Sequence, residues 1–239
     1  MIDMHSHILP GVDDGAQVLA DALEMLRIAR ADGVEVQMLT PHIHLDRYPN
    51  TRESLQQTFE GFQRQVADAG VDIELRLAAE LRIGPELVQL ANGDGLPWLG
   101  AWQGRHVMLM EFPHSSIPAG SENMVAWLIQ RDILPMIAHP ERNQALQSRP
   151  SKLEPFLAAG CLLQVTAGSL TGQFGAEARH LAEALLLEDR VTLLATDAHN
   201  LAYRPPNLSS GMAAAASLIG EAAARRLVEE NPRRILEAA

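Results

Sequence analysis

Two short segments near opposite ends of the chain carry closely spaced side chains that can bind metal ions. His5 and His7 are two residues apart, and so are Asp197 and His199. In a β-strand, residues at positions i and i+2 project to the same side. Each pair could therefore offer two ligands to one ion, and both pairs could share a site if the first and last strands were neighbours. Such a site points to a metal-dependent hydrolase.

Further residues of the same kind follow the other apolar runs of the chain. These runs predict seven strands, at 2–5, 34–39, 73–79, 106–111, 133–138, 162–166 and 191–196. Amphipathic stretches lie between them, for example at 19–26 and 178–185, where apolar residues have helical spacing. Nine potential ligands occupy the predicted strand ends or the loops just after them: His5, His7, Asp14, His42, Glu80, Glu111, His139, Asp197 and His199.

This alternation predicts an α/β fold in which residues 1–239 form a single domain of seven β-α units. Barrels of this class build their sites at the C-terminal ends of the strands, where the polar residues are found. We therefore expect a barrel with a metal site at that end. The alanine-rich stretch from about Asn207 onward is expected to form helices on the outside of the barrel.

The composition argues against several other functions. The net charge of -11 disfavours nucleic-acid binding, and no apolar run of 18 residues predicts a membrane span. Cys161, the only cysteine, is not followed by an arginine at the spacing of a cysteine-based phosphatase. Lys152, the only lysine, does not end a predicted strand, which disfavours a site bridged by a carbamylated lysine. Because the first strand begins at Met1 or Ile2, we expect no presequence and a cytoplasmic location.

The nine potential ligands exceed what a single ion needs, so two or three divalent ions with shared ligands fit better. Mixed histidine and carboxylate ligation suits Mn, Fe or Zn more than Mg or Ca. Closely spaced ions could hold a bridging hydroxide that attacks a phosphate ester. Arg142 and Arg204 are placed where they could bind phosphoryl oxygens, since guanidinium groups match phosphate geometry.

Six motifs, in order along the chain, resemble those of a known family. They are HSHILPGVDDG (5–15), TPH (40–42), AEL (79–81), HPER (139–142), AGSLTG (167–172) and TDAHN (196–200) with RPP (204–206). On these motifs the chain resembles the manganese-dependent bacterial protein tyrosine phosphatases of the PHP (polymerase and histidinol phosphatase) superfamily. The resemblance is to the CpsB/YwqE type, which is linked to capsule and exopolysaccharide synthesis.

The resemblance implies a distorted, TIM-like (βα)7 barrel with a centre of three ions, manganese by preference. It implies three ligand sets: His5, His7, Glu80 and Asp197; Glu80, Glu111 and His139; Asp14, His42 and His199. Arg142 and Arg204 would bind the phosphoryl oxygens. The implied substrates are phosphotyrosines on a bacterial tyrosine autokinase that controls polysaccharide export.

Several alternatives stay open. The same barrel could act on a small phosphomonoester such as histidinol phosphate, serve as a metal-loaded binding or scaffold domain, or hydrolyse an amide or lactone. Asp14 and His42 are both candidates for the proton donor to the leaving group. His114 competes with Glu111 as a ligand, although the strand position favours Glu111. Arg47 is either an accessory substrate contact or a solvated loop residue.

Overall fold

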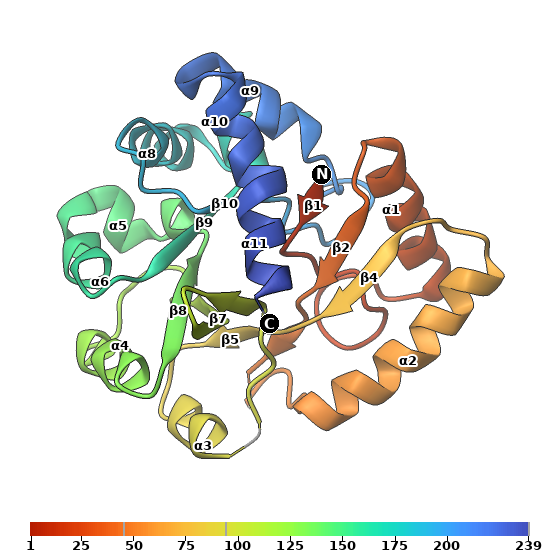
Figure 1. The fold of residues 1–239 in the computed structure, drawn as a ribbon, viewed down its shortest axis with the longest axis horizontal. Helices are drawn as coiled ribbons and strands as arrows, with labels where there is room; N and C mark the ends of the chain where they lie inside the picture. Colours follow the sequence, from red (N-terminus) through yellow and green to blue (C-terminus); the bar gives the residue numbers. More distant parts are fainter. Residues whose placement is uncertain (45, 94, 239) are drawn as a thin grey trace.

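The computed structural model describes residues 1–44, 46–93 and 95–238, in which strands alternate with helices (Figure 1). The strands are β1 Ile2–Asp3, β2 Val36–Leu39, β3 His42–Ile43, β4 Glu74–Leu77, β5 Glu80–Arg82, β6 Gly100–Trp102, β7 Arg105–Glu111, β8 Ile133–Ala138, β9 Leu162–Thr166 and β10 Leu193–Ala195. The α-helices are α1 Leu19–Ala31, α2 Arg52–Asp68, α3 Glu86–Asn92, α4 Ser121–Ile129, α5 Gln144–Ser148, α6 Glu154–Ala158, α7 Ala167–Leu170, α8 Ala176–Leu187, α9 Ser209–Ile219, α10 Glu221–Arg225 and α11 Asn231–Glu237. The described residues also form two 3₁₀-helices, η1 Pro140–Arg142 and η2 Pro150–Leu153, and one π-helical segment, η3 Arg226–Glu230.

The parallel strands form a closed ring. β1, β2 and β4 pair in one sheet, and β3, β5, β7, β8, β9 and β10 follow one another in a second sheet. β2 and β3 are successive parts of one path through the barrel, as are β4 and β5, so the two sheets are continuous. Beyond β1 and β10, the His7 amide donates to the Ala198 carbonyl at 2.8 Å, and the Asp197 amide donates to the His5 carbonyl at 2.8 Å. The predicted α/β fold is confirmed, and its first and last strands are neighbours, as the predicted barrel requires.

Buried apolar residues form two layers. The larger layer lies between the strands and the surrounding helices, where it includes Leu26 of α1 and Leu185 of α8. The second fills the barrel interior with side chains such as Met38, Leu109 and Met136. Every residue of β8 is buried, as expected for a parallel strand covered on both faces. At the C-terminal ends of the strands the buried residues are polar instead, among them His5, Glu80 and Asp197, and the candidate site lies there.

The C-terminal helices differ from the expectation in part. α9 packs against α7 and α8 on the outside of the barrel, as predicted. α11 contacts β6 and β1 and lies across the middle of the ring of strands in Figure 1. Its Ile235 is fully buried in the interior cluster, so α11 closes the end of the barrel opposite the polar site. The backbone of Ile235 approaches so closely that a Cβ on Gly100 would lie 2.2 Å from its carbonyl oxygen.

No helix in the described part of the chain combines the length and the apolar composition that crossing a membrane requires.

Candidate metal centre

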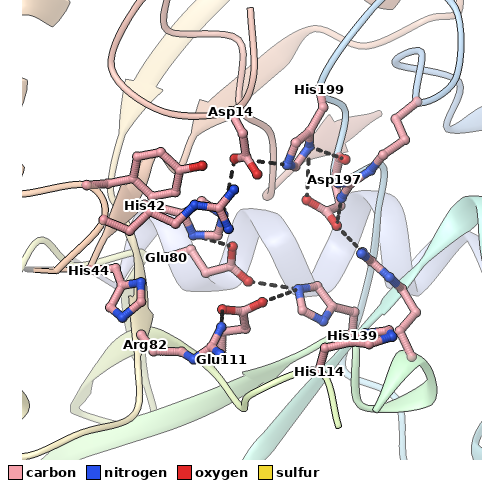
Figure 2. A pocket seen from close by; sticks show the side chains of 14 residues that line it. Asp14, His42, His44, Glu80, Arg82, Glu111, His114, His139, Asp197 and His199 are labelled. Atoms are coloured by element: carbon pink, nitrogen blue, oxygen red, sulfur yellow. Dashed lines mark hydrogen bonds and ion pairs between the residues drawn. The ribbon is translucent and has the colours of Figure 1, made fainter. Parts of the chain in front are cut away.

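A cavity of about 290 Å³ opens at the C-terminal ends of the barrel strands (Figure 2). Seven of the nine predicted ligands line it, while His5 and His7 are fully buried beside them. The complete lining is Asp14, His42, His44, Arg47, Tyr48, Glu80, Arg82, Glu111, His114, His139, Arg142, Asp197, His199 and Arg204. The structure therefore brings all nine predicted ligands and both predicted arginines to one barrel mouth.

Four predicted ligands approach one another with the spacing of a coordination shell. The Nε2 atoms of His5 and His7 are 3.2 Å apart. Oε2 of Glu80 lies 3.4 Å and 3.3 Å from these nitrogens, and Oδ1 of Asp197 lies 3.2 Å and 3.3 Å from them. A tetrahedral ion with bonds of about 2.0–2.1 Å holds its ligand atoms about 3.3–3.4 Å apart. The distances from each oxygen to the two imidazole nitrogens suit a divalent cation; Glu80 forms a group of potential ligands with both imidazoles, whereas Asp197 forms one with His5 and His139.

The same two carboxylate oxygens also favour a cation. Glu80 Oε2 and Asp197 Oδ1 are buried and form no regular hydrogen bond among the described residues, and the ion-pair partners of both oxygens are imidazole nitrogens at 3.2 Å or more. A buried charged oxygen without a partner is costly, because it loses its hydration without compensation. A cation between these oxygens and the two imidazoles would remove that cost, so the residues present suit a metal ion.

Two further groups of potential ligands adjoin this one. Glu80, Glu111 and His139 form the first, with His139 Nε2 at 2.8 Å from Glu80 Oε1 and 3.9 Å from Glu111 Oε1. Figure 2 shows these three side chains converging on one side of the cavity. In the second, Asp14 Oδ1 lies 3.5 Å from His42 Nε2 and 3.7 Å from His199 Nε2. The second group also includes His7, and a further group joins His139 to His5 and Asp197, so the groups overlap the three predicted ligand sets without matching them one to one.

Burial sets the protonation of several imidazoles. It lowers the pKa of His42 and, together with repulsion from His7, brings the pKa of His199 down to about 2. Burial and the Arg142 guanidinium lower the pKa of His139. These three side chains are therefore neutral near pH 7, which is the form that binds a metal.

Neighbouring groups fix which nitrogen each imidazole presents. His5 Nδ1 lies 2.8 Å from Gln164 Oε1, and His7 Nδ1 lies 2.7 Å from Asp13 Oδ2, so both rings direct Nε2 toward the shared centre. Such partners orient the ring and raise its basicity as a ligand. Asp13 also accepts from the Gly15 amide at 2.9 Å, a bond that orders this turn. Gly15 has no room for a side chain, since a Cβ would lie 1.8 Å from the His7 carbonyl oxygen.

Two predicted ligands have an uncommon backbone conformation. His139 has φ 33° and Asp197 has φ 52°, in the left-handed region that residues other than glycine seldom adopt. Each follows the end of a strand, β8 or β10, where the chain turns sharply away. Strained residues of this kind cluster at functional sites, where the surrounding structure holds them in place.

Arg142 and Arg204 lie together at one side of the cavity. Both guanidinium groups donate to the same carboxylate oxygen, Oδ2 of Asp197. Although burial opposes ionisation, Arg204, His5 and Arg142 hold the pKa of Asp197 well below its usual value. The two arginines therefore lie beside the group of His5, His7, Glu80 and Asp197, as a phosphate clamp requires.

Three contributors were not predicted. Gln164, on β9, orients His5, and its signal in the sequence is a polar residue inside an apolar strand. Arg82 donates to Glu111 Oε2 at 2.8 Å. Tyr48 stacks on His42 with ring centroids 5.4 Å apart and an angle of 6°. Of the two rivals, Glu111 belongs to a group of potential ligands, whereas His114 only lines the cavity.

Comparison with known proteins agrees with this geometry. The chain is 32% identical to tyrosine-protein phosphatase YwqE of Bacillus subtilis, over 85% of this chain and 79% of that protein. It is 26% identical to tyrosine-protein phosphatase CpsB of Streptococcus pneumoniae, over 99% and 98%. The chain also superimposes on a crystal structure from a study of YwqE and CpsB, which describes both as metal-dependent tyrosine phosphatases. The TM-score is 0.91 at 28% identity, over 100% of this chain and 95% of the other.

The fold and the site define an α/β-barrel enzyme of the metal-dependent phosphatase class. More narrowly, the profile of the family described as "Capsular polysaccharide synthesis, CpsB/CapC" matches residues 1–237, and the chain belongs to that family.

Proposed function

We propose that this chain is a metal-dependent protein tyrosine phosphatase. One observation carries the proposal: a single cavity holds adjoining groups of metal ligands and, beside them, two arginines that meet on Asp197. Cations and guanidinium groups together suit a phosphate ester, whose negative charge they can neutralise from two sides. The names of the relatives support tyrosine as the phosphorylated residue.

We propose two or three divalent ions at this site, with manganese as the first candidate and iron or zinc as alternatives. His5, His7, Glu80 and Asp197 would hold one ion, and the two adjoining groups would hold the others. The ligands are histidines and carboxylates, a mixture that transition metals accept more readily than Mg or Ca. When bound, the ions supply a water activated as the nucleophile and positive charge for the phosphoryl oxygens.

Arg142 and Arg204 would orient the phosphoryl group. A guanidinium has five N–H donors, so each arginine can keep its bond to Asp197 and still donate to a phosphoryl oxygen. Because Asp197 Oδ2 accepts from both, the two guanidinium groups lie near each other before a substrate binds. That preorganisation lowers the barrier because the charge on the transferring group meets donors already in place.

The leaving group of phosphotyrosine is a phenolate, whose conjugate acid has a pKa of about 10. Its departure needs less help from an acid than the departure of an alkoxide. Asp14 and His42 line the cavity, with Asp14 Oδ1 at 3.5 Å from His42 Nε2, and either would donate the proton only in its protonated form, not while it binds an ion. Tyr48, stacked on His42, offers an aromatic surface for the substrate ring, and Arg47 lines the same wall.

The substrate we propose is a phosphotyrosine protein, and specifically a bacterial tyrosine kinase of capsule or exopolysaccharide export. The family description, which refers to capsular polysaccharide synthesis, supports this choice. Because the kinase consumes ATP, we place the reaction in the cytoplasm.

The test compares substrates on one preparation of metal-loaded protein. A phosphotyrosine peptide and histidinol phosphate are assayed side by side for kcat/KM, with a phosphoserine peptide of the same sequence as the control. We expect the phosphotyrosine peptide to be preferred to both. A large preference for histidinol phosphate would replace the proposal with a small-molecule phosphatase, and no hydrolysis of any phosphomonoester would favour a scaffold.

A further inference from the structure

The connection between β9 and α8, called the loop after β9 although it includes the short helix α7, contributes no ligand to the described groups. It contains one of the motifs noted in the sequence, AGSLTG at 167–172. Just beyond this motif lies Phe174, which is partly buried. Its ring packs against both arginines of the cavity. The Cζ atom of Arg142 lies 4.4 Å from the ring centroid, and the Cζ atom of Arg204 lies 5.7 Å from it.

The ring and Asp197 together confine the two guanidinium groups. Asp197 Oδ2 accepts a hydrogen bond from each arginine, while the Phe174 ring offers its negative face to both cations. Both arginines line the cavity, but Phe174 is not among its described lining residues. The ring therefore acts on a phosphate group only through the arginines.

The loop that carries Phe174 is tied to both arginine-bearing segments, each time at the residue just before the arginine. Ser169 Oγ donates to Glu141 Oε1 at 2.7 Å, and Glu141 precedes Arg142. Gln173 Nε2 donates to the carbonyl oxygen of Tyr203, which precedes Arg204. These two hydrogen bonds hold the loop against both arginine-bearing segments, so the loop fixes the position of the Phe174 ring relative to both arginines.

Gly168 makes room for this arrangement. A Cβ at this position would lie 2.2 Å from Gln173 Oε1 and 3.1 Å from Cε2 of the Phe174 ring. A larger residue would displace the tie to Tyr203 or the ring itself. Glycine at this position thus allows the contacts of Gln173 and Phe174 with the arginine-bearing segments, and its Cβ would meet no metal ligand among the nearest atoms.

We infer that Phe174 is a positioning residue that holds Arg142 and Arg204 in the orientation needed to bind a phosphoryl group. The inference rests on the proposed function and adds a residue to it. Arginine side chains lose considerable rotamer freedom when they bind a ligand, and a platform that restricts them beforehand reduces that cost. Two arginines share one ring here, so its loss should weaken both contacts.

The test replaces Phe174→Leu, which keeps an apolar side chain and removes the aromatic face. Binding of inorganic phosphate to the metal-loaded protein is measured by calorimetry, and kcat and KM are measured on a phosphotyrosine peptide. We expect phosphate affinity to fall about tenfold, with KM raised by a similar factor and metal content unchanged. Phe174→Trp and Phe174→Tyr should restore most of the affinity, because each retains an aromatic face.

A double-mutant cycle separates positioning from packing. In an Arg142→Gln background the ring acts on Arg204 alone, so Phe174→Leu should reduce phosphate affinity by a smaller factor than in the parent. Trp127→Leu is the matched control, since Arg131 lies 3.9 Å from the Trp127 ring centroid on α4, away from the cavity. It should leave phosphate binding unchanged.

The inference is overturned if Phe174→Leu binds phosphate like the parent, if its effect is the same in the Arg142→Gln background, or if it only lowers the thermal stability as Trp127→Leu does. A failure of the proposed function would look different. The parent protein would then bind phosphate, with the expected sensitivity to Phe174, but would not hydrolyse phosphotyrosine peptides.

Discussion

Arg142 and Arg204 lie in the segments that follow different strands, β8 and β10, yet their guanidinium groups meet on one oxygen of Asp197. The two side chains are largely buried, with 17% and 22% of their surface exposed. Water therefore screens their charges less than it would at the surface, and their attraction for a phosphoryl group is correspondingly stronger. Substitution of either arginine should therefore lower the reaction rate without lowering the metal content.

Arg142→Ala and Arg204→Ala should each raise the barrier by about 2.7–4 kcal/mol, which is a loss of about 10²–10³ in rate. Steady-state assays on a phosphotyrosine peptide give the rate, and elemental analysis should show that the ions are retained. Arg179→Ala, which removes an exposed ion pair on α8, is the control and should have no effect. Unchanged kinetics in both cavity variants would remove these arginines from the mechanism.

His5 and His7 make metal binding depend on pH. Burial alone would lower the pKa of His5, but the Asp197 and Glu80 carboxylates outweigh it and raise the pKa. The pKa of His7 is also raised despite burial, chiefly by Asp13. Both imidazoles therefore bind protons more readily in the metal-free protein than an ordinary histidine does, and a metal must compete with these protons.

The apparent metal affinity should consequently rise with pH, by up to roughly tenfold per pH unit for each proton released. It should level off once the pH exceeds the raised pKa values of His5 and His7. Competition with a chelator, from about pH 6 to about pH 9, measures this slope. An affinity that stays constant over this range would contradict the assignment of His5 and His7 as ligands.

At the level of residues, the sequence predicted the metal-ligand candidates that follow the strands, but it did not predict contacts that depend on the conformation of a loop. The nine ligand candidates could be found because strand ends of a barrel face one mouth. The contact of Phe174 with two arginines could not, because it depends on how the loop after β9 returns to η1 and to Tyr203. The bond from His7 to Asp13 likewise requires the conformation of the turn at 11–15.

The elements themselves show a similar division. All seven predicted strands are present within a few residues, since most of them are buried apolar runs bounded by turn residues; in β4 only Leu75 is buried. β3 and β5 were not predicted, because they are short and begin with the polar residues His42 and Glu80. β6 was also missed. It pairs antiparallel to β7 outside the ring, and nothing in a three-residue strand distinguishes it from a loop.

The position of α11 could not be predicted from its pattern. Apolar periodicity indicates that one face of a helix is buried, but it does not say whether that face meets the outside or the end of a barrel. The structure places α11 at the end, where Ile235 joins side chains of the interior such as Leu193 and Val107. This helix therefore supports the barrel from the side opposite the candidate metal centre.

Ile235→Ala should destabilise the protein by about 2–5 kcal/mol, because it leaves a cavity at a fully buried position. Chemical denaturation of the metal-free protein measures the change. Glu237→Ala, an exposed change on the same helix, should stay within about 0.5 kcal/mol. Activity per folded molecule should be preserved in both variants, and a stability loss under about 1 kcal/mol for Ile235→Ala would show that α11 does not support the barrel.

For the whole molecule, ring closure is what makes a site from distant residues. The hydrogen bonds between the segments at 5–7 and 197–198 bring the first and last strands together. We propose on this basis that residues 1–239 act as one catalytic unit. The chain is acidic overall, at -11, but divalent ions with Arg142 and Arg204 would make the cavity locally positive. An anionic substrate is therefore compatible with the charge of the molecule.

We propose that these remote side chains share one cluster of ions that the reaction requires. The most direct measurement is the number of ions per chain, determined together with phosphotyrosine phosphatase activity before chelation, after chelation and after manganese is restored. We predict two or three ions per chain, activity that is lost and regained with them, and a marked loss of both in Glu80→Gln, since Glu80 adjoins several ligand groups. A protein that retains full activity after its ions have been removed would contradict the account.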